Sequence, residues 1–342
     1  MKTSTLICSA MAAVIALAPA NAEAKKKKKN KEQPATEVPA PKPTQAAKPV
    51  PAAPPKPYVA YVMQPSVPSS MQFCGKKVDL DRVDMFERFD RELTALAFGH
   101  GNTLLTIKRA NKCFPEMAPI LREEGVPEDL LYLACVESYL APLTVSPAKA
   151  AGIWQFIPST ARQYGLEVSD EVDERYNLAK ATRAAAKYLK NAYGKYGDWP
   201  TVMASYNAGM GRISSELDKQ LAQSSFDLHL NQETSRYVFR IMAMKAIMEN
   251  APAFGFVIRP EQLYQPMDYN EVEVSGPVAD WASWARDKGI SYAQLKEANP
   301  WIRDRKLTNK AGNTYKVRIP AEKSLKRSTA GTKTYDKRWI SL

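Results

Sequence analysis

Residues 127–140 read PEDLLYLACVESYL, a stretch that begins like a helix and then stays apolar on almost every face. A proline followed by two acidic residues is a common helix start. At 3.6 residues per turn, Glu137 shares a helix face with Leu130, Leu133 and Ala134. A carboxyl group on such a face loses water, which raises its pKa toward the range of a general acid that works near neutral pH. Glu137 is therefore the candidate catalytic residue.

Helical spacing of apolar residues continues on both sides of this stretch. Upstream, apolar residues recur at intervals of three and four from Val83 to Leu96. Further amphipathic helices are expected at about 103–123, 127–141, 159–165, 178–194, 199–206 and 233–250. No run between residues 75 and 250 alternates like a strand. The pattern predicts a compact, all-helical domain over residues 71–255.

A second, smaller domain is expected at residues 265–321. Residues 271–274 alternate like a strand, residues 281–298 have the spacing of two short helices, and residues 315–320 read as a closing strand. This β-α-α-β order predicts a small α+β unit. The expected fold class is therefore mainly α, with one small mixed domain.

The N-terminal part is expected to lie outside both domains. Residues 1–24 contain Lys2, an apolar run from about Leu6 to Ala18 and small residues suited to cleavage, which favours a cleaved export signal over an uncleaved anchor. Residues 25–70 are rich in Lys, Ala and Pro and are expected to be a disordered tether. The protein is therefore expected to be exported, to the periplasm or cell envelope.

The formal net charge of +12 is concentrated in the terminal segments. Residues 25–70 carry +7 and residues 321–342 carry +4, so residues 71–320 are nearly neutral. The basic tail, residues 322–342, and the tether suit a polyanionic surface such as a membrane or a wall polymer. A merely solvated tail is an equally good interpretation. Nucleic acid is not expected as a partner, because the central region has no basic excess.

The cysteines and histidines limit which disulfide bonds, metal sites and catalytic mechanisms are expected. Cys8 lies in the export signal, and Cys135 is most simply a small core residue. Cys74 and Cys113 could pair in an oxidising compartment or stay free thiols, and both alternatives are open. The chain has only two histidines, and no Cys/His cluster has the spacing of a metal site. No metal or other cofactor and no Ser-His-Asp mechanism are therefore expected.

Three short motifs follow one another inside the helical block. They are Glu137-Ser138, the run from Ser146 to Pro158, and Ser205-Tyr206-Asn207-Ala208-Gly209. Small residues in the second motif let the backbone approach a ligand closely, and Gln155 can hydrogen-bond to it. Trp154 and Phe156 suit either the wall of a ligand site or the protein core. Asn207 can hold a ligand or help to end a helix.

In this order and spacing, the motifs resemble those of the goose-lysozyme-like soluble lytic transglycosylases, most closely the membrane-bound lytic transglycosylase D group. The match spans roughly residues 75–250 and includes Asp173-Glu174-Arg175 and the run from Glu233 to Val238. The resemblance implies a lysozyme-like helical fold. It also implies cleavage of the bond from N-acetylmuramic acid to N-acetylglucosamine in peptidoglycan glycan strands, with a 1,6-anhydro end as product.

The resemblance also assigns roles to site residues. Glu137 would protonate the leaving oxygen and then deprotonate the sugar's own 6-hydroxyl, although most glycosidases use two carboxyl groups. Substrate contacts are implied for Ser138, Ser146, Gln155, Tyr206, Asn207 and Tyr237. Arg175 is better explained by a structural ion pair than by a ligand contact. A purely structural Glu137, neutralised by Arg236 or Arg240, is the alternative to a catalytic one.

Residues 265–321 resemble a LysM module, which binds glycans containing N-acetylglucosamine. The resemblance lies in Asp287-Lys288-Gly289-Ile290-Ser291, Leu295, Asn299-Pro300 and Val317-Arg318-Ile319-Pro320. The first loop, from Ser275 to Asp280, departs from the usual Gly-Asp-Thr. Packing against the catalytic domain is therefore the alternative to sugar binding.

Together, these patterns predict an exported peptidoglycan lytic transglycosylase that is expected to be a monomer. One rival is a goose-type lysozyme-like hydrolase that adds water across the bond. Another is a non-catalytic anchor that only binds peptidoglycan. The presence of Glu137, Gln155 and Asn207 favours an enzyme over the anchor. The two enzymes differ in their products, because an anhydro end is one water lighter than a hydrolysed one.

Overall fold

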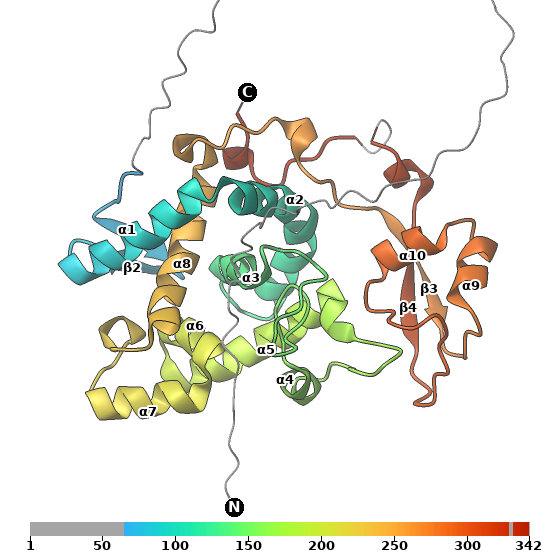
Figure 1. Ribbon diagram of the computed structural model, residues 1–342, viewed down its shortest axis with the longest axis horizontal. Coiled ribbons are helices and arrows are strands. Elements are labelled where there is room, and N and C mark those ends of the chain that lie inside the picture. The colour runs from blue at the N-terminus through green and yellow to red at the C-terminus, as the bar shows by residue number, and fades with distance from the viewer. Residues whose placement is uncertain (1–64, 328–330, 342) are drawn as a thin grey trace, which may run out of the picture. The chain divides into compact units, whose positions relative to one another are not determined.

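The computed structural model describes residues 65–327 and 331–341, so the expected export signal and nearly all of the tether lie outside the described residues. The first part of the described chain is mostly helical, as predicted. Its long helices are α1 (Val83–Phe98), α2 (His100–Glu123), α3 (Leu131–Ser138), α4 (Pro158–Gln163), α5 (Leu178–Tyr196), α6 (Trp199–Ala208), α7 (Met210–Gln220) and α8 (Gln232–Glu249) (Figure 1). Single turns of 3₁₀-helix lie at Glu128–Leu130, Glu174–Tyr176, Ser225–Asp227, Ala251–Phe254 and Pro260–Gln262.

The helices enclose one hydrophobic core. Helix α8 packs against α1, α3 and α6, while α2 packs against α3 and α5, so that α3 lies between α2 and α8 (Figure 1). Leu133, Ala134 and Cys135 of α3 are completely buried. The apolar character of α3 on nearly every face follows from this central position, because each face meets another helix.

A β-hairpin precedes the helices, and the sequence analysis did not predict it. Strand β1 (Ser70–Phe73) pairs antiparallel with β2 (Lys76–Asp79). The two residues between them, Cys74 and Gly75, both have positive φ angles, 49° and 77°, as tight hairpin turns require. The expectation of a purely α-helical first domain is therefore corrected: strands of this length are too short to show a clear alternation.

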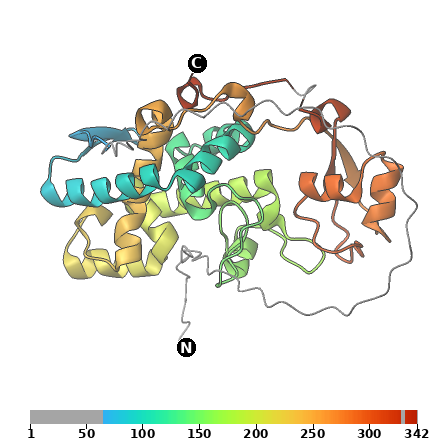
Figure 2. The same cartoon turned by 45° about the horizontal axis from the view of Figure 1, so that its top comes forward.

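The second part of the described chain has the predicted β-α-α-β order. It consists of β3 (Tyr269–Val274), α9 (Trp281–Asp287), α10 (Tyr292–Ala298) and β4 (Tyr315–Pro320). The two strands pair antiparallel with Tyr269 opposite Pro320, and Figure 2 shows them gathered with both helices, in orange. Trp281, Leu295 and Val317 are buried in a separate core cluster. We call residues 269–320 the C-terminal module.

The C-terminal segment packs onto the helical domain, a contact that neither interpretation of the basic tail included. A 3₁₀ turn follows the module at Glu322–Leu325, and another lies at Lys337–Trp339. The Trp339 side chain is only 1% exposed and packs edge-on against Phe114 of α2. The Asn111 side chain also donates to the backbone carbonyl of Lys333 at 2.9 Å. The basic C-terminal residues therefore lie in a segment that the apolar side chain of Trp339 holds against the helical domain.

The cysteines of the described region are free thiols. Cys74, Cys113 and Cys135 are all buried and unpaired. Of the two alternatives that the sequence left open for Cys74 and Cys113, the structure has the unpaired one. None of the helices among the described residues combines the length and hydrophobicity that a bilayer span needs.

Candidate active site

Glu137 lies in the last turn of α3, where the helix stops abruptly. Tyr139 and Leu140 both adopt left-handed backbone conformations, with φ angles of 51° and 54°. The Tyr139 amide still donates to the carbonyl of Cys135 at 2.8 Å and closes the helix end. The chain therefore turns away directly after Glu137, and the carboxyl group stands at the end of a buried helix.

The Glu137 carboxyl group accepts a hydrogen bond from helix α8. The hydroxyl of Tyr237 on α8 donates a short hydrogen bond to Glu137 Oε1. Burial raises the pKa of Glu137 to about 7, and the Tyr237 hydrogen bond opposes this shift only in part. The Glu233 carboxylate raises this pKa further, whereas Arg240 lowers it. Glu137 therefore holds a proton up to neutral pH, as a general acid must.

The two arginines that could have neutralised Glu137 pair with another carboxylate. Arg236 and Arg240 both donate to Glu92 of α1, the latter through Nε at 2.9 Å. The Glu92 side chain is only 1% exposed. Its two arginine partners satisfy this buried charge and tie α1 to α8. The structural alternative, in which either arginine forms an ion pair with Glu137, is therefore not what the geometry shows.

The second motif forms an irregular loop over residues 144–157, which we call the active-site loop. Gln155 lies in it with a φ angle of 50°, and its side-chain amide donates to the carbonyls of Thr144 at 3.1 Å and Gly152 at 2.7 Å. The Ser146 hydroxyl accepts from the Ala150 amide at 3.1 Å. In the structure these two side chains hold the loop in shape, while the resemblance implied contacts with substrate.

Side chains of the three helices α3, α5 and α6 form hydrogen bonds with the active-site loop. The Ser138 hydroxyl of α3 donates to the carbonyl of Ile153 at 2.8 Å. The Tyr206 hydroxyl of α6 donates to the carbonyl of Trp154 at 2.6 Å. Trp154 is fully buried, and its indole N–H donates to Thr182 of α5 at 3.0 Å. Trp154 is therefore a core residue rather than a platform for sugar.

The third motif contributes one residue near the acid and one structural residue. Burial and the charge of Glu137 raise the pKa of Tyr206, so its hydroxyl stays protonated beside the acid. The Asn207 side chain is 6% exposed and accepts from the Thr234 hydroxyl at 3.0 Å, which joins α6 to α8. Among the predicted site residues, the structure thus brings Tyr237 into contact with Glu137 and places Tyr206 nearby. Ser138, Ser146, Gln155 and Asn207 are engaged by the protein itself.

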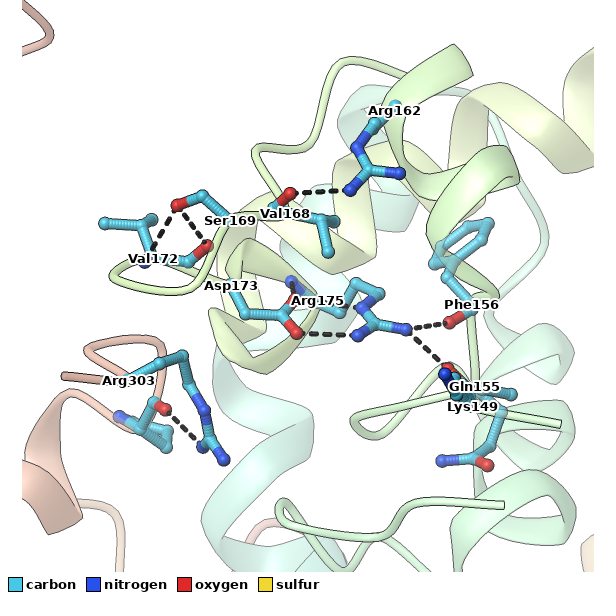
Figure 3. Close-up of polar contacts among 12 residues, drawn as sticks. Lys149, Gln155, Phe156, Arg162, Val168, Ser169, Val172, Asp173, Arg175 and Arg303 are labelled. Atoms are coloured by element: carbon cyan, nitrogen blue, oxygen red, sulfur yellow. Dashed lines mark hydrogen bonds and ion pairs between the residues drawn. The ribbon is translucent and has the colours of Figure 1, made fainter. Parts of the chain in front are cut away.

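Arg175 has a larger part in the site than the sequence showed. The predicted ion pair with Asp173 is present, at 2.7 Å, and both side chains are buried. In addition, Arg175 Nη1 donates to the carbonyls of Lys149 and Phe156 in the active-site loop, at 2.7 and 3.0 Å (Figure 3). Backbone carbonyls have no sequence signature, so these contacts could not be predicted. Within the described residues, no group of three His, Cys, Asp or Glu side chains is arranged to bind a metal.

A helical fold that presents a protonated glutamate at the end of a buried helix defines a lysozyme-like class of protein. Residues 118–228 match the family model described as the transglycosylase SLT domain. Residues 270–323 match the soluble lytic transglycosylase C-terminal LysM-like domain. The chain therefore carries an SLT domain that contains Glu137, Gln155 and Asn207, followed by a LysM-like module.

Two similar proteins have a transglycosylase activity in their names. The chain is 33% identical over 188 residues to the membrane-bound lytic murein transglycosylase D of Escherichia coli K12, a match that covers 54% of this chain and 41% of that protein. It is also 33% identical over 121 residues to the peptidoglycan transglycosylase gp16 of Escherichia phage T7, which covers 34% of this chain and 9% of that protein. The matched regions thus cover less than half of the length of either relative.

Proposed function

We propose that this protein is a peptidoglycan lytic transglycosylase that cleaves the bond from N-acetylmuramic acid to N-acetylglucosamine. One observation carries the proposal: Glu137, in the SLT domain, has a pKa of about 7 and is held by Tyr237. A carboxyl group that keeps its proton at neutral pH can protonate a glycosidic oxygen. The names of the two relatives, a lytic murein transglycosylase and a peptidoglycan transglycosylase, support the same substrate class.

The first chemical step is acid-catalysed bond cleavage. Since Tyr237 donates to Glu137 Oε1, the carboxyl proton belongs on Oε2. It passes to the glycosidic oxygen as the bond from that oxygen to the anomeric carbon of the muramic acid breaks. The carbonyl oxygen of the sugar's own N-acetyl group stabilises the positive anomeric carbon. Glu137 is left as a carboxylate, which the Tyr237 hydrogen bond favours.

The second step closes the sugar on itself. The 6-hydroxyl oxygen of the same sugar attacks the anomeric carbon, and the Glu137 carboxylate takes its proton. The 1,6-anhydro bond forms, Glu137 is protonated again, and no water is consumed. The attacking hydroxyl is already part of the bound sugar, so its effective concentration is high. One carboxyl group thus serves as acid and then as base.

The test is an analysis of the muropeptides released from purified sacculi. The wild-type protein should release anhydro ends, and Glu137→Gln should lower turnover by about 10³-fold or more while keeping the fold. The matched control is Glu123→Gln, the same chemical change at an exposed end of α2, where Glu123 pairs with Arg183 at 3.0 Å. Ends heavier by one water would identify a hydrolase, and retained turnover in Glu137→Gln would remove this residue as the acid.

The proposed substrate also indicates where the protein acts. Peptidoglycan lies in the cell envelope, in agreement with the export signal expected at residues 1–24. The nearly neutral central region leaves glycan strands, rather than nucleic acid, as the partner of the site. We infer that the basic segments outside the helical domain lie against the anionic wall or membrane surface, and that the protein acts as a monomer.

A further inference from the structure

Asp173 and Arg175 form the most completely buried ion pair beside the active-site loop. Arg175 donates through Nε to Asp173 Oδ1 at 2.9 Å and through Nη2 to Oδ2 at 2.7 Å. This bidentate geometry leaves Nη1 free to bind the active-site loop. It does so at both ends of the Lys149–Phe156 segment (Figure 3). One guanidinium group therefore sets the spacing of the loop.

The backbone of Arg175 also touches the loop. At Gly152, which has a φ angle of 77°, an added Cβ would lie 2.0 Å from the carbonyl oxygen of Arg175. The backbone of Gly152 therefore packs directly against the backbone of Arg175. The guanidinium group of the same arginine bonds to Lys149 and Phe156. Because the side chain and the backbone of Arg175 both contact the loop, a shift of Arg175 must shift the loop.

The segment that carries Arg175 is in turn held by the C-terminal module. The Asp173 amide donates to the carbonyl of Trp301 at 2.9 Å, and the Arg303 amide donates to the carbonyl of Glu171 at 2.8 Å. Val172 and Ile302 between them form a β-bridge. Residues 171–173 therefore add a short strand-like contact to the module.

Side chains strengthen this contact. Val172 and Tyr176 are buried in the same core cluster as Trp281 and Leu295 of the module. Ala151 of the active-site loop belongs to that cluster too. The module core is thus completed by residues of the SLT domain, and it includes a residue of the active-site loop.

We infer that Asp173 and Arg175 are positioning residues, and that through them the C-terminal module holds the active-site loop in its working shape. The module therefore contributes to turnover as well as to any binding of glycan. The inference rests on the proposed function for its rate measurement only. Its structural part concerns the loop and the module and is measured without substrate.

The first experiment compares two arginine variants of the full chain. Arg175→Lys keeps the charge but cannot span Asp173, Lys149 and Phe156 at once. We expect the turnover number on sacculi to fall at least about tenfold, with sacculus binding and KM unchanged and with faster amide hydrogen exchange in residues 144–157. The control is Arg183→Lys, because Arg183 pairs from an exposed position with Glu123 at 3.0 Å and with Glu124 at 3.7 Å, both outside the loop.

Two results would overturn the inference. Unchanged turnover and unchanged loop exchange in Arg175→Lys would show that the loop does not depend on Arg175. A parallel loss of turnover and sacculus binding, with unchanged loop exchange, would make Arg175 a direct glycan contact. If the wild type itself proved inactive on sacculi, the proposed function would fail, while the exchange data would still decide the coupling.

A second experiment uses the wild-type protein alone, so its result does not depend on whether a variant folds. Four backbone amides report on the coupling: Ala151 and Gly152 within the loop, Asp173 on the connecting segment, and Arg303 in the module. We expect all four to lose protection from hydrogen exchange at the same urea concentration, as one cooperative unit. Loss of the Asp173 and Arg303 protection at lower urea, with Ala151 and Gly152 still protected, would overturn the inference.

Discussion

Glu137 owes its raised pKa to burial, and a neighbour on another helix limits the rise. Burial at the end of α3 removes water from the carboxyl group, and Tyr237 of α8 supplies the hydrogen bond that limits the resulting pKa shift. Tyr206 of α6 stays protonated beside it. The apolar face around Glu137 was visible in the sequence. Which tyrosine would reach it was suggested only by a motif match.

A change at Tyr237 should move the pH dependence of turnover. The Tyr237 hydrogen bond lowers the pKa of Glu137, so Tyr237→Phe should raise that pKa above its value of about 7. The acid form required for the first step then persists to higher pH. The falling limb of the kcat/KM profile should shift to higher pH, while the maximum falls about tenfold.

The control for this experiment is Tyr196→Phe. Tyr196 donates to the carbonyl of Met210 at 2.7 Å, away from Glu137, and its loss should leave the pH profile in place. A shift of the falling limb to lower pH in Tyr237→Phe would contradict the assigned direction of the Tyr237 hydrogen bond.

For the other site residues, the roles that the sequence suggested stay predictions. Ser138, Gln155 and Asn207 lie in motifs that mark the site, yet each side chain bonds to the protein. A motif indicates which residue type stands at a position. It does not indicate whether the side chain bonds to a sugar hydroxyl or to a backbone carbonyl of the protein. That distinction depends on the direction of the side chain, which the local sequence does not determine.

Among the elements, the active-site loop has the least regular backbone. Lys149 and Gln155 have positive φ angles of 62° and 50° without being glycine. Each such residue costs about 1 kcal/mol, so contacts from outside the loop must stabilise it. Arg175, Ser138 and Tyr206 supply those contacts, from one short turn and two helices.

A side chain at Gly152 should disrupt this element. In Gly152→Ala the new Cβ would meet the Arg175 carbonyl oxygen at 2.0 Å, and the backbone has a φ angle of 77°. We expect a loss of about 3 kcal/mol in the free energy of unfolding, together with reduced turnover. Thermal or urea unfolding measures the first, and muropeptide release measures the second.

Gly165→Ala is the matched control for the steric part of this effect. Gly165 has a similar φ angle of 86°, but an added Cβ would meet nothing within 4 Å. It should cost about 1 kcal/mol, from backbone strain only. Equal losses in the two variants would mean that the close approach of Gly152 to Arg175 does not constrain the loop.

The elements that the sequence predicted well are those with long or central apolar patterns. Helix α3 and the β-α-α-β order of the module belong to this group. Helix α7 was missed because Ile213 is its only fully buried residue, so the apolar stripe is weak. The hairpin of β1 and β2 was missed because four residues per strand are too few for a period of two to stand out.

At the scale of the whole molecule, the two ends of the described chain both pack onto the helical domain. Phe73 and Val78 of the hairpin and Trp339 of the C-terminal segment belong to the main core cluster. For the basic C-terminal segment, composition left a solvated tail and a surface-binding tail equally open, and it did not indicate packing onto the helical domain, because charge is counted over a whole segment. A few apolar residues within such a segment are enough to anchor it.

The burial of the three cysteines in the described part of the chain gives a test of the fold. Burial raises the pKa of each thiol, and that of Cys113 rises to about 12. A thiol reagent such as Ellman's reagent should therefore label none of Cys74, Cys113 and Cys135 in the native protein at pH 8. After unfolding in guanidinium, all three should react within minutes.

The control uses protein reduced with dithiothreitol before unfolding. Equal counts with and without prior reduction are expected from free thiols. A count that rises by two after reduction would reveal a bond between Cys74 and Cys113, contrary to the structure.

The bridge between Val172 and Ile302 joins residues that a ribosome makes far apart in time. At a synthesis rate of about 5–20 residues per second, Ile302 follows Val172 by roughly 10 s. During that interval residues 171–173, which lie next to Arg175, lack their partner strand. In a newly made chain this bridge forms only after residue 302 has been added, so the segment next to Arg175 gains its partner strand late in synthesis.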